Sequence, residues 1–410
     1  MPKLMMGNSA ISPATVFNIE TVPCYIPLDE NYDVDQNGKL ISNNNRTSYT
    51  TGIGVTDIGN NILQLAFNGN SNIITVEFPE ITTISGNYAC EKMLRNANNV
   101  TTLSFPELVS ITGNYALQCL CMAEDSMGSG TSGTGNKITT LTFPKLKSVT
   151  GNYGCYQMFG FYGWVEDPST QGPKLTTINL GALEVASGTR CFSSCFEQLG
   201  TVTSCDLHSL KIAGNSSFQS FLAGNNNLAG EFVFDNLIQV GPYAFSNFSQ
   251  GSKITKFGAP NLTSITDFGV FSSCVDSNAT LTEINFNNLT TIDIGSQTVP
   301  TYYNGAFSSA FGGTGLTTVS FPKLETIKMP KCFIDTFFNC SNLTSVSFPA
   351  LKSNAFGSWT NQFNYMLERT NGVTVHFPSN LQSVIGSWSD VTNGFGGTNT
   401  TVLFDLPATE

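Results

Sequence analysis

A hydrophobic pattern recurs along most of the chain. In residues 316–321 the apolar side chains stand first, fourth and sixth, and Pro322, Leu324 and Ile327 follow; residues 138–149 repeat this order. The pattern predicts a short strand whose alternate side chains point inward. The strand ends at the proline, because proline has no N–H to give to a sheet. Leu324 and Ile327 are then expected to be buried on the return path.

The repeat has a period of 27 residues. Each unit is counted from the residue five before the Phe, or its substitute, of the Phe-Pro pair; 100−73 and 343−316 are two of five separations of 27. Three separations are longer, at 38 (138−100), 37 (175−138) and 35 (316−281). A fixed period predicts a solenoid whose units share one core, since a single unit cannot close its own. The unit starts are Ile73, Val100, Ile138, Leu175, Val202, Ala229, Ile254, Leu281, Leu316, Leu343 and Gly372, after a partial unit at 51–72.

The full scheme, Leu-x-x-Val-x-Phe-Pro-x-Leu-x-x-Ile followed by Ala-Phe-x-x-Cys, resembles the leucine-rich repeats of BspA-like surface proteins. The Ala-Phe pair occurs at 244–245 and 306–307, and the resemblance covers residues 52–407. It implies an α/β-type, mostly β solenoid with one parallel sheet face and an irregular or short-helical opposite face. We expect about 12 units and a C-terminal cap over 51–410. The chain departs from the family in having longer units and in carrying Gly-Asn-Tyr at 86–88, 113–115 and 151–153.

Composition narrows the classes of function. Charged residues make up 11% of the chain and the net charge is −11, with Thr, Ser, Asn and Gly in place of the missing charges. A polar but uncharged surface suits a protein that works outside cells or in a regular assembly. The negative charge, without a run of Lys or Arg, argues against nucleic acid as a partner. No stretch of 18 apolar residues predicts a membrane span.

The first 50 residues differ from the repeats and are expected to cap the first unit and attach the protein to a larger assembly. Within them, Asp33, Asp35 and Asn37 copy the first half of an EF-hand loop, but the twelfth position is Asn44 and not Glu. The alternative is a β-hairpin with its turn at residues 37–38, which we favour over a calcium site.

Residues 1–13 show no apolar core of signal-peptide length, so we expect a protein made in the cytoplasm without a leader. Residues 3–13 also resemble the short N-terminal segments of some phage tail and head-fibre proteins. Together these features favour a virion surface, or another extracellular surface, as the location.

Chemistry-bearing residues are few. The 11 cysteines include six at one phase of the repeat, where the family has a buried Cys, so we expect core thiols and no metal or other cofactor. Two histidines leave little from which to build a catalytic triad. The Gly-rich run at 128–135 lacks the Lys-Ser/Thr ending of a phosphate loop and is expected to be an insertion. Those six cysteines are Cys90, Cys119, Cys155, Cys195, Cys274 and Cys340.

Two surfaces are candidates for binding. On the sheet face, the third and fifth residues of successive units should form ladders of hydroxyl and amide groups, which either suit exposed strands in general or bind a glycan or protein. Candidates in this ladder are Thr140, Thr142, Thr177 and Asn179.

The second surface comes from the insertions. Those at 122–136 and 160–173 share one phase of adjacent units and should project side by side, and a third covers 295–305. Aromatic residues with nearby carboxylates can stack on a sugar or anchor a protein interface, although such loops also pack down onto a scaffold. The candidate contact residues are Phe161, Tyr162, Trp164, Glu166, Asp167, Tyr302 and Tyr303.

The sequence therefore favours a non-enzymatic recognition, adhesion or structural protein. The leading expectation is an exposed phage virion protein, a fibre or a decoration, that is anchored by residues 1–50 and binds a glycan or protein of the host surface. A bacterial cell-surface adhesin and a polysaccharide depolymerase, which would need two carboxylates in a groove, are the alternatives. Homo-oligomerisation is left open.

Overall fold

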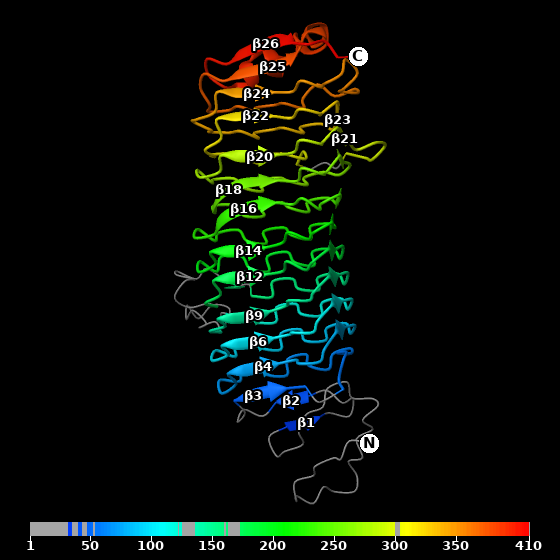
Figure 1. The fold of residues 1–410 in the computed structure, drawn as a ribbon, viewed down its shortest axis with the longest axis vertical. Coiled ribbons are helices and arrows are strands. Elements are labelled where there is room, and N and C mark those ends of the chain that lie inside the picture. The colour runs from blue at the N-terminus through cyan, green and yellow to red at the C-terminus, as the bar shows by residue number, and fades with distance from the viewer. Residues whose placement is uncertain are drawn as a thin grey trace, which may run out of the picture.

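The computed structural model is a tall stack of about 12 coils, shown upright in Figure 1. It describes residues 47–51, 54–121, 136–159, 173–299 and 304–409, and the backbone alone of 32–34, 40–42, 123–124 and 161–162. Most coils carry a strand, a bend, a second short strand and a long run of turns. The mostly β solenoid with a parallel sheet face, predicted from the repeat, is confirmed.

The first strand of each coil forms the sheet face. Its strands pair in parallel with Thr75, Thr102 and Thr140 in register, although 27 residues separate the first two and 38 the second two. Thr, Ser and Val favour such half-buried strands, and hydrogen bonding divides the face into four sheets. The strands are β3 (Ser48–Thr50), β4 (Thr75–Glu77), β6 (Thr102–Ser104), β9 (Thr140–Thr142), β12 (Thr177–Asn179), β14 (Ser204–Asp206), β16 (Ala229–Val233), β18 (Lys253–Gly258), β20 (Glu283–Asn285), β22 (Thr318–Ser320), β24 (Ser345–Ser347), β25 (Thr374–Pro378) and β26 (Thr401–Leu406).

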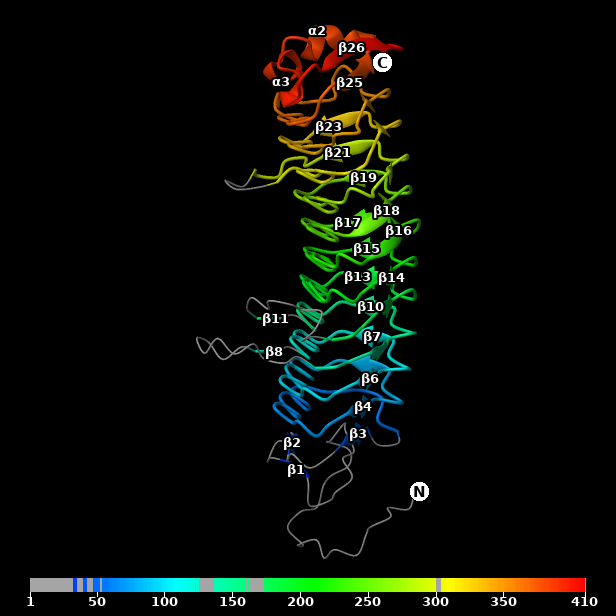
Figure 2. The same cartoon turned by 90° about the vertical axis from the view of Figure 1, so that its left-hand side faces the viewer.

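A second parallel ladder runs beside the sheet face, on the wall that follows the Phe-Pro bend (Figure 2). Its inward residue in each coil is the apolar one that the sequence placed on the return path, such as Ile84, Ile111 and Ile327. The ladder comprises β5 (Thr83–Ile84), β7 (Ser110–Ile111), β10 (Ser148–Val149), β13 (Val185–Ala186), β15 (Ile212–Ala213), β17 (Gln239–Val240), β19 (Ser264–Ile265), β21 (Thr291–Asp293) and β23 (Thr326–Lys328).

The third wall is a ribbon of turns, which we call the turn ribbon; in one coil it spans 87–97. Its N–H groups alternate between two uses: Tyr88 N–H donates to the next coil, at Asn114 C=O (2.9 Å), whereas Glu91 N–H donates to Tyr88 C=O (3.3 Å) within its own coil. Every fourth residue has a positive φ, as in Tyr88 (53°) and Lys92 (52°). Non-glycine residues adopt this conformation rarely, and here the hydrogen bonds between coils hold it.

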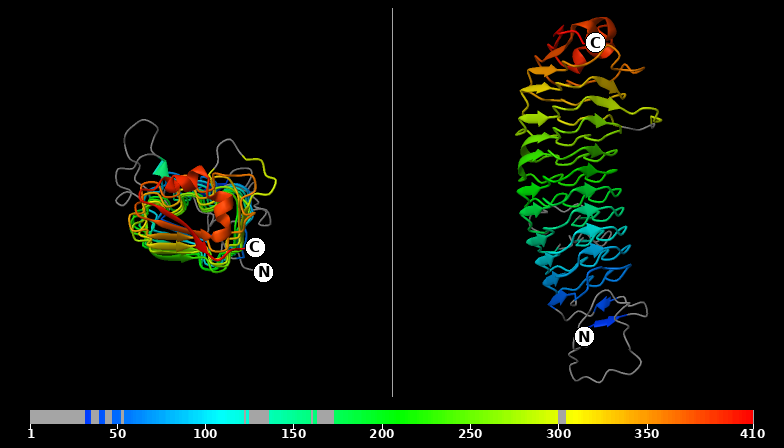
Figure 3. Two further views of the ribbon diagram at one scale, coloured as in Figure 1. Left: turned by 90° about the horizontal axis from the view of Figure 1, so that it is seen from above. Right: turned by 45° about the vertical axis from the view of Figure 1, so that its right-hand side comes forward.

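The core is one column of side chains along the whole stack, and much of it is aromatic. Phe192, Phe218 and Phe245 belong to a stacked series on the inner side of the turn ribbon, with ring centroids 5.5–5.6 Å apart. From the opposite wall, Phe321 and Phe348 of the Phe-Pro motif stack 5.5 Å apart. Viewed along its length, the solenoid shows its coils superimposed on one outline (Figure 3). Phe218 therefore contacts Phe192 in one neighbouring coil and Phe245 in the other.

Buried polar residues close the turn ribbon before the next strand. Asn225 is fully buried; its amide nitrogen donates to Phe196 C=O (2.8 Å) and Leu222 C=O (2.9 Å), and its Oδ1 accepts from Gly200 N–H (3.2 Å). Asn278, at the equivalent position two coils later, is also fully buried, and its amide nitrogen donates to Ile254 C=O (3.1 Å). A turn cannot satisfy all its own backbone groups, so a buried amide supplies the missing partners.

The two ends are different. Near the N-terminus, β1 (Tyr32–Val34) and β2 (Leu40–Ser42) pair antiparallel, as the predicted hairpin requires, and its turn lies outside the described residues. Strand β3 already stacks on β4, so the sheet face begins at Ser48. At the C-terminal end, η1 (Ser379–Leu381), α2 (Gln382–Ile385), α3 (Ser389–Thr392) and η2 (Gly394–Gly396) form a cap. No helix among the described residues has the length and apolarity to cross a membrane.

Candidate functional site

The sheet-face candidates point outward, but some of their hydroxyl groups hydrogen-bond to side chains of neighbouring strands. Thr142 Oγ1 shares a hydrogen bond of 2.9 Å with Ser104 Oγ, and Thr177 Oγ1 accepts one of 3.2 Å from Ser204 Oγ. Thr140 and Thr177 are exposed, whereas Thr142 is half-buried. Strands β9 and β12 belong to different sheets, and the insertion at 160–173 ends just before β12. The predicted ladder is therefore interrupted between the strand of Thr142 and the strand of Thr177.

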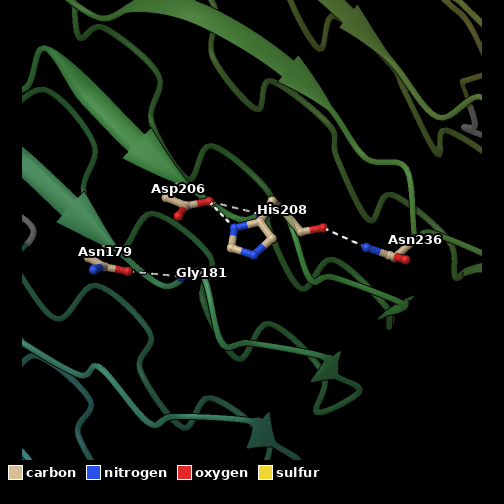
Figure 4. A network of polar contacts seen from close by, with 5 residues as sticks. All are labelled: Asn179, Gly181, Asp206, His208 and Asn236. Carbon is tan, nitrogen blue, oxygen red and sulfur yellow. Dashed lines mark hydrogen bonds and ion pairs between the residues drawn. The ribbon is translucent and has the colours of Figure 1, made fainter.

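Asn179 lies in a polar network at the end of β12 and β14 (Figure 4). It is in register with Asp206, whose Oδ1 is 2.7 Å from His208 Nδ1. Asn179 Oδ1 accepts from Gly181 N–H (3.1 Å), and Asn236 donates to His208 C=O (2.9 Å). A Cβ at Gly181 would lie 2.5 Å from Asp206 Oδ2, so a side chain there would have to displace this carboxylate. The network orients an exposed imidazole whose Nε2 faces away from the carboxylate.

The second histidine repeats this arrangement elsewhere. His376 Nδ1 is 3.0 Å from Asp405 Oδ1, on the last two strands of the sheet face. Each histidine thus meets one carboxylate, and the two pairs lie many coils apart (Figure 1). Among the residues that the structure describes, no group of three or more His, Cys, Asp or Glu side chains could hold a metal ion.

Several charged side chains pair between neighbouring coils. Lys211 Nζ is 2.6 Å from Glu184 Oε2, and this hydrogen bond and charge lower the pKa of Glu184. Lys256 lies between Glu231 (3.4 Å) and Glu283 (3.5 Å), whose charges raise the pKa of its ammonium group. Exposed pairs of this kind contribute little stability.

The two adjacent insertions lie side by side. The backbone of β11 (Phe161–Tyr162) pairs in parallel with that of β8 (Ala123–Glu124), with Phe161 opposite Ala123. Both project from the wall of the solenoid (Figure 2). The expectation that insertions of equal phase would meet is confirmed for these backbones. The other predicted contact residues, Trp164, Glu166, Asp167, Tyr302 and Tyr303, lie outside the described residues.

The coils that carry these insertions, and the coil before them, also carry a stack of rings at the surface. Tyr88 and Tyr115 are 4.8 Å apart between centroids and 3° from parallel, and Tyr115 and Tyr153 are 5.0 Å and 8°. Tyr88 is 38% exposed and the other two are half-buried. We call these three residues the tyrosine stripe. The sequence analysis did not select it, although the Gly-Asn-Tyr triplet that recurs three times is its signal.

The other two residues of each triplet hold the stripe in place. A Cβ at Gly113 or Gly151 would come inside 3.0 Å of the glycine backbone in the preceding coil, so only glycine allows this approach. The asparagines form a ladder: Asn87 Oδ1 accepts from Asn114 N–H and Asn114 Oδ1 from Asn152 N–H, both at 2.9 Å. The rings are therefore set at the spacing of the coils.

The thiols belong to the core. All ten cysteines in the described residues are free and nine of them are buried. Burial raises the pKa of the thiols of Cys121, Cys155, Cys274 and Cys332, so they stay neutral. A neutral buried thiol is a poor nucleophile and a poor metal ligand, and this agrees with the expected core role.

Comparisons with known proteins find structural matches but no sequence match. The sequence matches no protein-family model and no curated protein. Among solved structures, a leucine-rich repeat protein from Bacteroides ovatus aligns over 92% of this chain and 99% of its own, with 15% identity and a TM-score of 0.27. A leucine-rich cell surface protein from Faecalibacterium prausnitzii aligns over 92% and 94%, with 14% identity and a TM-score of 0.32. The pneumococcal vaccine antigen PcpA aligns over 91% and 98%, with 14% identity and a TM-score of 0.22. At these identities and TM-scores the resemblance decides nothing about function.

Proposed function

We propose that this protein is a non-enzymatic recognition protein, which presents the walls of a rigid solenoid to a partner on a cell surface. One observation carries the proposal. The coil starting at Val100 bears both Tyr115 and β8, and the next coil bears both Tyr153 and β11, so half-buried surface rings and paired insertion strands occur together. Loops and aromatic side chains on a rigid scaffold are the usual means of recognition. Phe161 and Tyr162 are the contact residues that we propose on the insertion.

The surface that we propose to carry the protein is that of a phage particle, as a fibre or a decoration attached through residues 1–50. The resemblance of residues 3–13 to phage fibre proteins supports this location. A bacterial surface adhesin is the second candidate, and the BspA-like repeat scheme favours it. Mass spectrometry of purified particles tests the choice: the protein should be present in stoichiometric amounts, and its absence from particles would favour the adhesin.

A polysaccharide depolymerase is the rival activity. The isolated position of each histidine, and the pairing of Glu107, Glu184 and Glu325 with lysines of the next coil, support binding over hydrolysis. The purified protein should release neither reducing ends nor unsaturated sugars from the polysaccharides of the host. Release of either would replace the binding proposal by an enzymatic one.

Recognition itself is tested with fluorescently labelled protein on cells of the bacterium that the particle infects. We expect saturable binding that unlabelled protein displaces. Exchanging residues 160–172 for a Gly-Ser linker of equal length should weaken binding at least tenfold, whereas Tyr243→Asn, several coils away, should leave it unchanged. Binding that is unsaturable, or indifferent to both changes, would contradict the proposal.

A further inference from the structure

The tyrosine stripe is not required by the fold. Its residues share one position of the coil, and in other coils the same position holds Asn61, Arg190 or Ser216, all with φ between 49° and 55°. From Phe192 onward the aromatic stack lies inside the wall and not on it. Three consecutive coils thus place rings outside where smaller or charged side chains serve equally well. Exposed aromatic rings cost solubility, so their presence needs another explanation.

Stacking decides what the stripe can offer to a ligand. The ring of Tyr115 lies between those of Tyr88 and Tyr153, at 4.8 Å and 5.0 Å, so its faces are covered. Its rim and hydroxyl remain for a ligand. No described residue hydrogen-bonds to the three hydroxyls, and each can both donate and accept. The stripe is therefore a straight row of hydroxyl groups, one to each coil, with apolar ring edges between them.

Neighbouring side chains extend this row with further polar and aromatic groups. Tyr156 meets Tyr153 edge to face at 5.4 Å. Gln118 and Gln157, three and four residues along the turn ribbon from Tyr115 and Tyr153, are half-buried and carry amide groups. Beyond Tyr153 stands Arg190, exposed and without an ion pair to any described residue. In the first of the three coils the matching positions hold Glu91 and Lys92, which form an ion pair of 3.6 Å. The surface is therefore polar and aromatic over three coils, with one paired charge at one end and Arg190 at the other.

From these features we infer that the stripe binds a linear, extended polysaccharide that runs along the solenoid axis, with one sugar opposite each coil. Such a chain repeats hydroxyl groups and apolar ring edges at regular intervals, which matches a periodic row of phenols and amides. The Asn ladder and the glycines fix the rings before binding, so little side-chain entropy is lost. A globular partner would need an aromatic anchor free to enter a pocket, and stacked rings are not. The inference gives a ligand class to the recognition function proposed above and rests on it.

The test is isothermal titration with hexasaccharides. The probes are the β-1,4-linked hexamers of glucose and of N-acetylglucosamine, which are extended, and the α-1,4-linked glucose hexamer, which is coiled. We expect at least one extended probe to bind at least tenfold more tightly than the coiled one. Equal binding of all three, or no binding of either extended probe, would overturn the inference.

Variants locate the site. Tyr115→Asn removes the middle ring and uses the residue that the chain itself has at Asn61, so the positive φ is retained; it should weaken binding at least tenfold. Tyr115→Phe keeps the ring and should weaken it about threefold. Tyr243→Asn is the matched control, since Tyr243 has the same position and φ (53°) but packs against Gly269 outside the stripe. Binding that survives Tyr115→Asn unchanged would place the sugar elsewhere.

The two proposals fail in different ways. If labelled protein binds cells and neither extended hexamer binds, recognition stands and the polysaccharide is wrong; loss of cell binding in Tyr115→Asn would then assign the stripe to a protein partner. If the labelled protein does not bind cells, the proposed recognition function is itself wrong. Circular dichroism of each variant confirms that the solenoid is folded.

Discussion

Asn225 offers a quantitative test of how the coils are held together. Its side chain makes three hydrogen bonds in a fully buried position, to Phe196 C=O, Leu222 C=O and Gly200 N–H. In Asn225→Ala the carbonyl of Phe196 loses the partner described for it, which costs about 1–3 kcal/mol for a buried acceptor. Leu222 C=O retains the N–H of residue 225 (3.3 Å), and Gly200 N–H is half-buried. These two bonds therefore contribute about 1 kcal/mol each.

The sum predicts that Asn225→Ala lowers the free energy of unfolding by about 3–5 kcal/mol. Asn227→Ala is the control: Asn227 lies on the same turn, is exposed, and donates one bond to Gly200 C=O (2.9 Å). Its loss should cost no more than about 1 kcal/mol. Urea unfolding followed by circular dichroism measures both variants through the shift in midpoint at constant slope. Equal midpoints for the two variants would refute the view that the buried amide supplies what the turn ribbon lacks.

Three further predictions concern the core, the thiols and one carboxyl group. Phe105 stacks on Phe78 at 4.4 Å, and two later coils have Leu180 and Leu207 at its position. Phe105→Leu should therefore cost about 1 kcal/mol in urea unfolding and Phe105→Ala about 3–5 kcal/mol; equal costs would contradict the packing described. At pH 8 the ten described thiols should resist an aromatic disulfide reagent until urea unfolds the chain, and rapid reaction of several thiols in the native protein would show that they are accessible. Burial, and then the charge of Glu368, raise the pKa of Asp335 above its ordinary 3.8, so its protonated form favours the folded state and that contribution is lost as the pH rises through the raised pKa. Asp335→Asn should therefore gain stability relative to the native protein between pH 4 and pH 7, about the range in which a raised carboxyl titrates, and parallel pH profiles would contradict the assignment.

The sequence predicts the architecture well because its signal is repeated. Thr102 and Thr140 could be placed in register from the Phe-Pro position alone, despite the 11 extra residues (38−27) between their coils. The second ladder was not predicted, since strands as short as Ser110–Ile111 show no alternation to read. Its inward residues were nevertheless expected to be buried, so the core was anticipated without the strands.

The candidate site was harder to predict. The backbones of Phe161 and Tyr162 lie where the phase of the insertions placed them, but the tyrosine stripe was missed. Propensity rules put Gly, Asn or Asp at a positive φ, and Tyr115 has a φ of 56° because its N–H donates to Asn152 C=O at 2.8 Å. A hydrogen bond between coils is invisible to a local rule. Only the recurrence of Gly-Asn-Tyr at one phase carries the information.

The register of Thr75, Thr102 and Thr140 has a consequence for how such a protein can change. Strands on both sides of the insertion at 122–136 keep the spacing of strands that no insertion separates. Loop length and axial rise are thus independent variables. Mutation can lengthen, shorten or rewrite a loop while the row of tyrosines beside it keeps its pitch, and a gained or lost coil changes the reach of the molecule by about 4.8 Å without touching the loops. What the molecule touches and how far it extends can evolve separately.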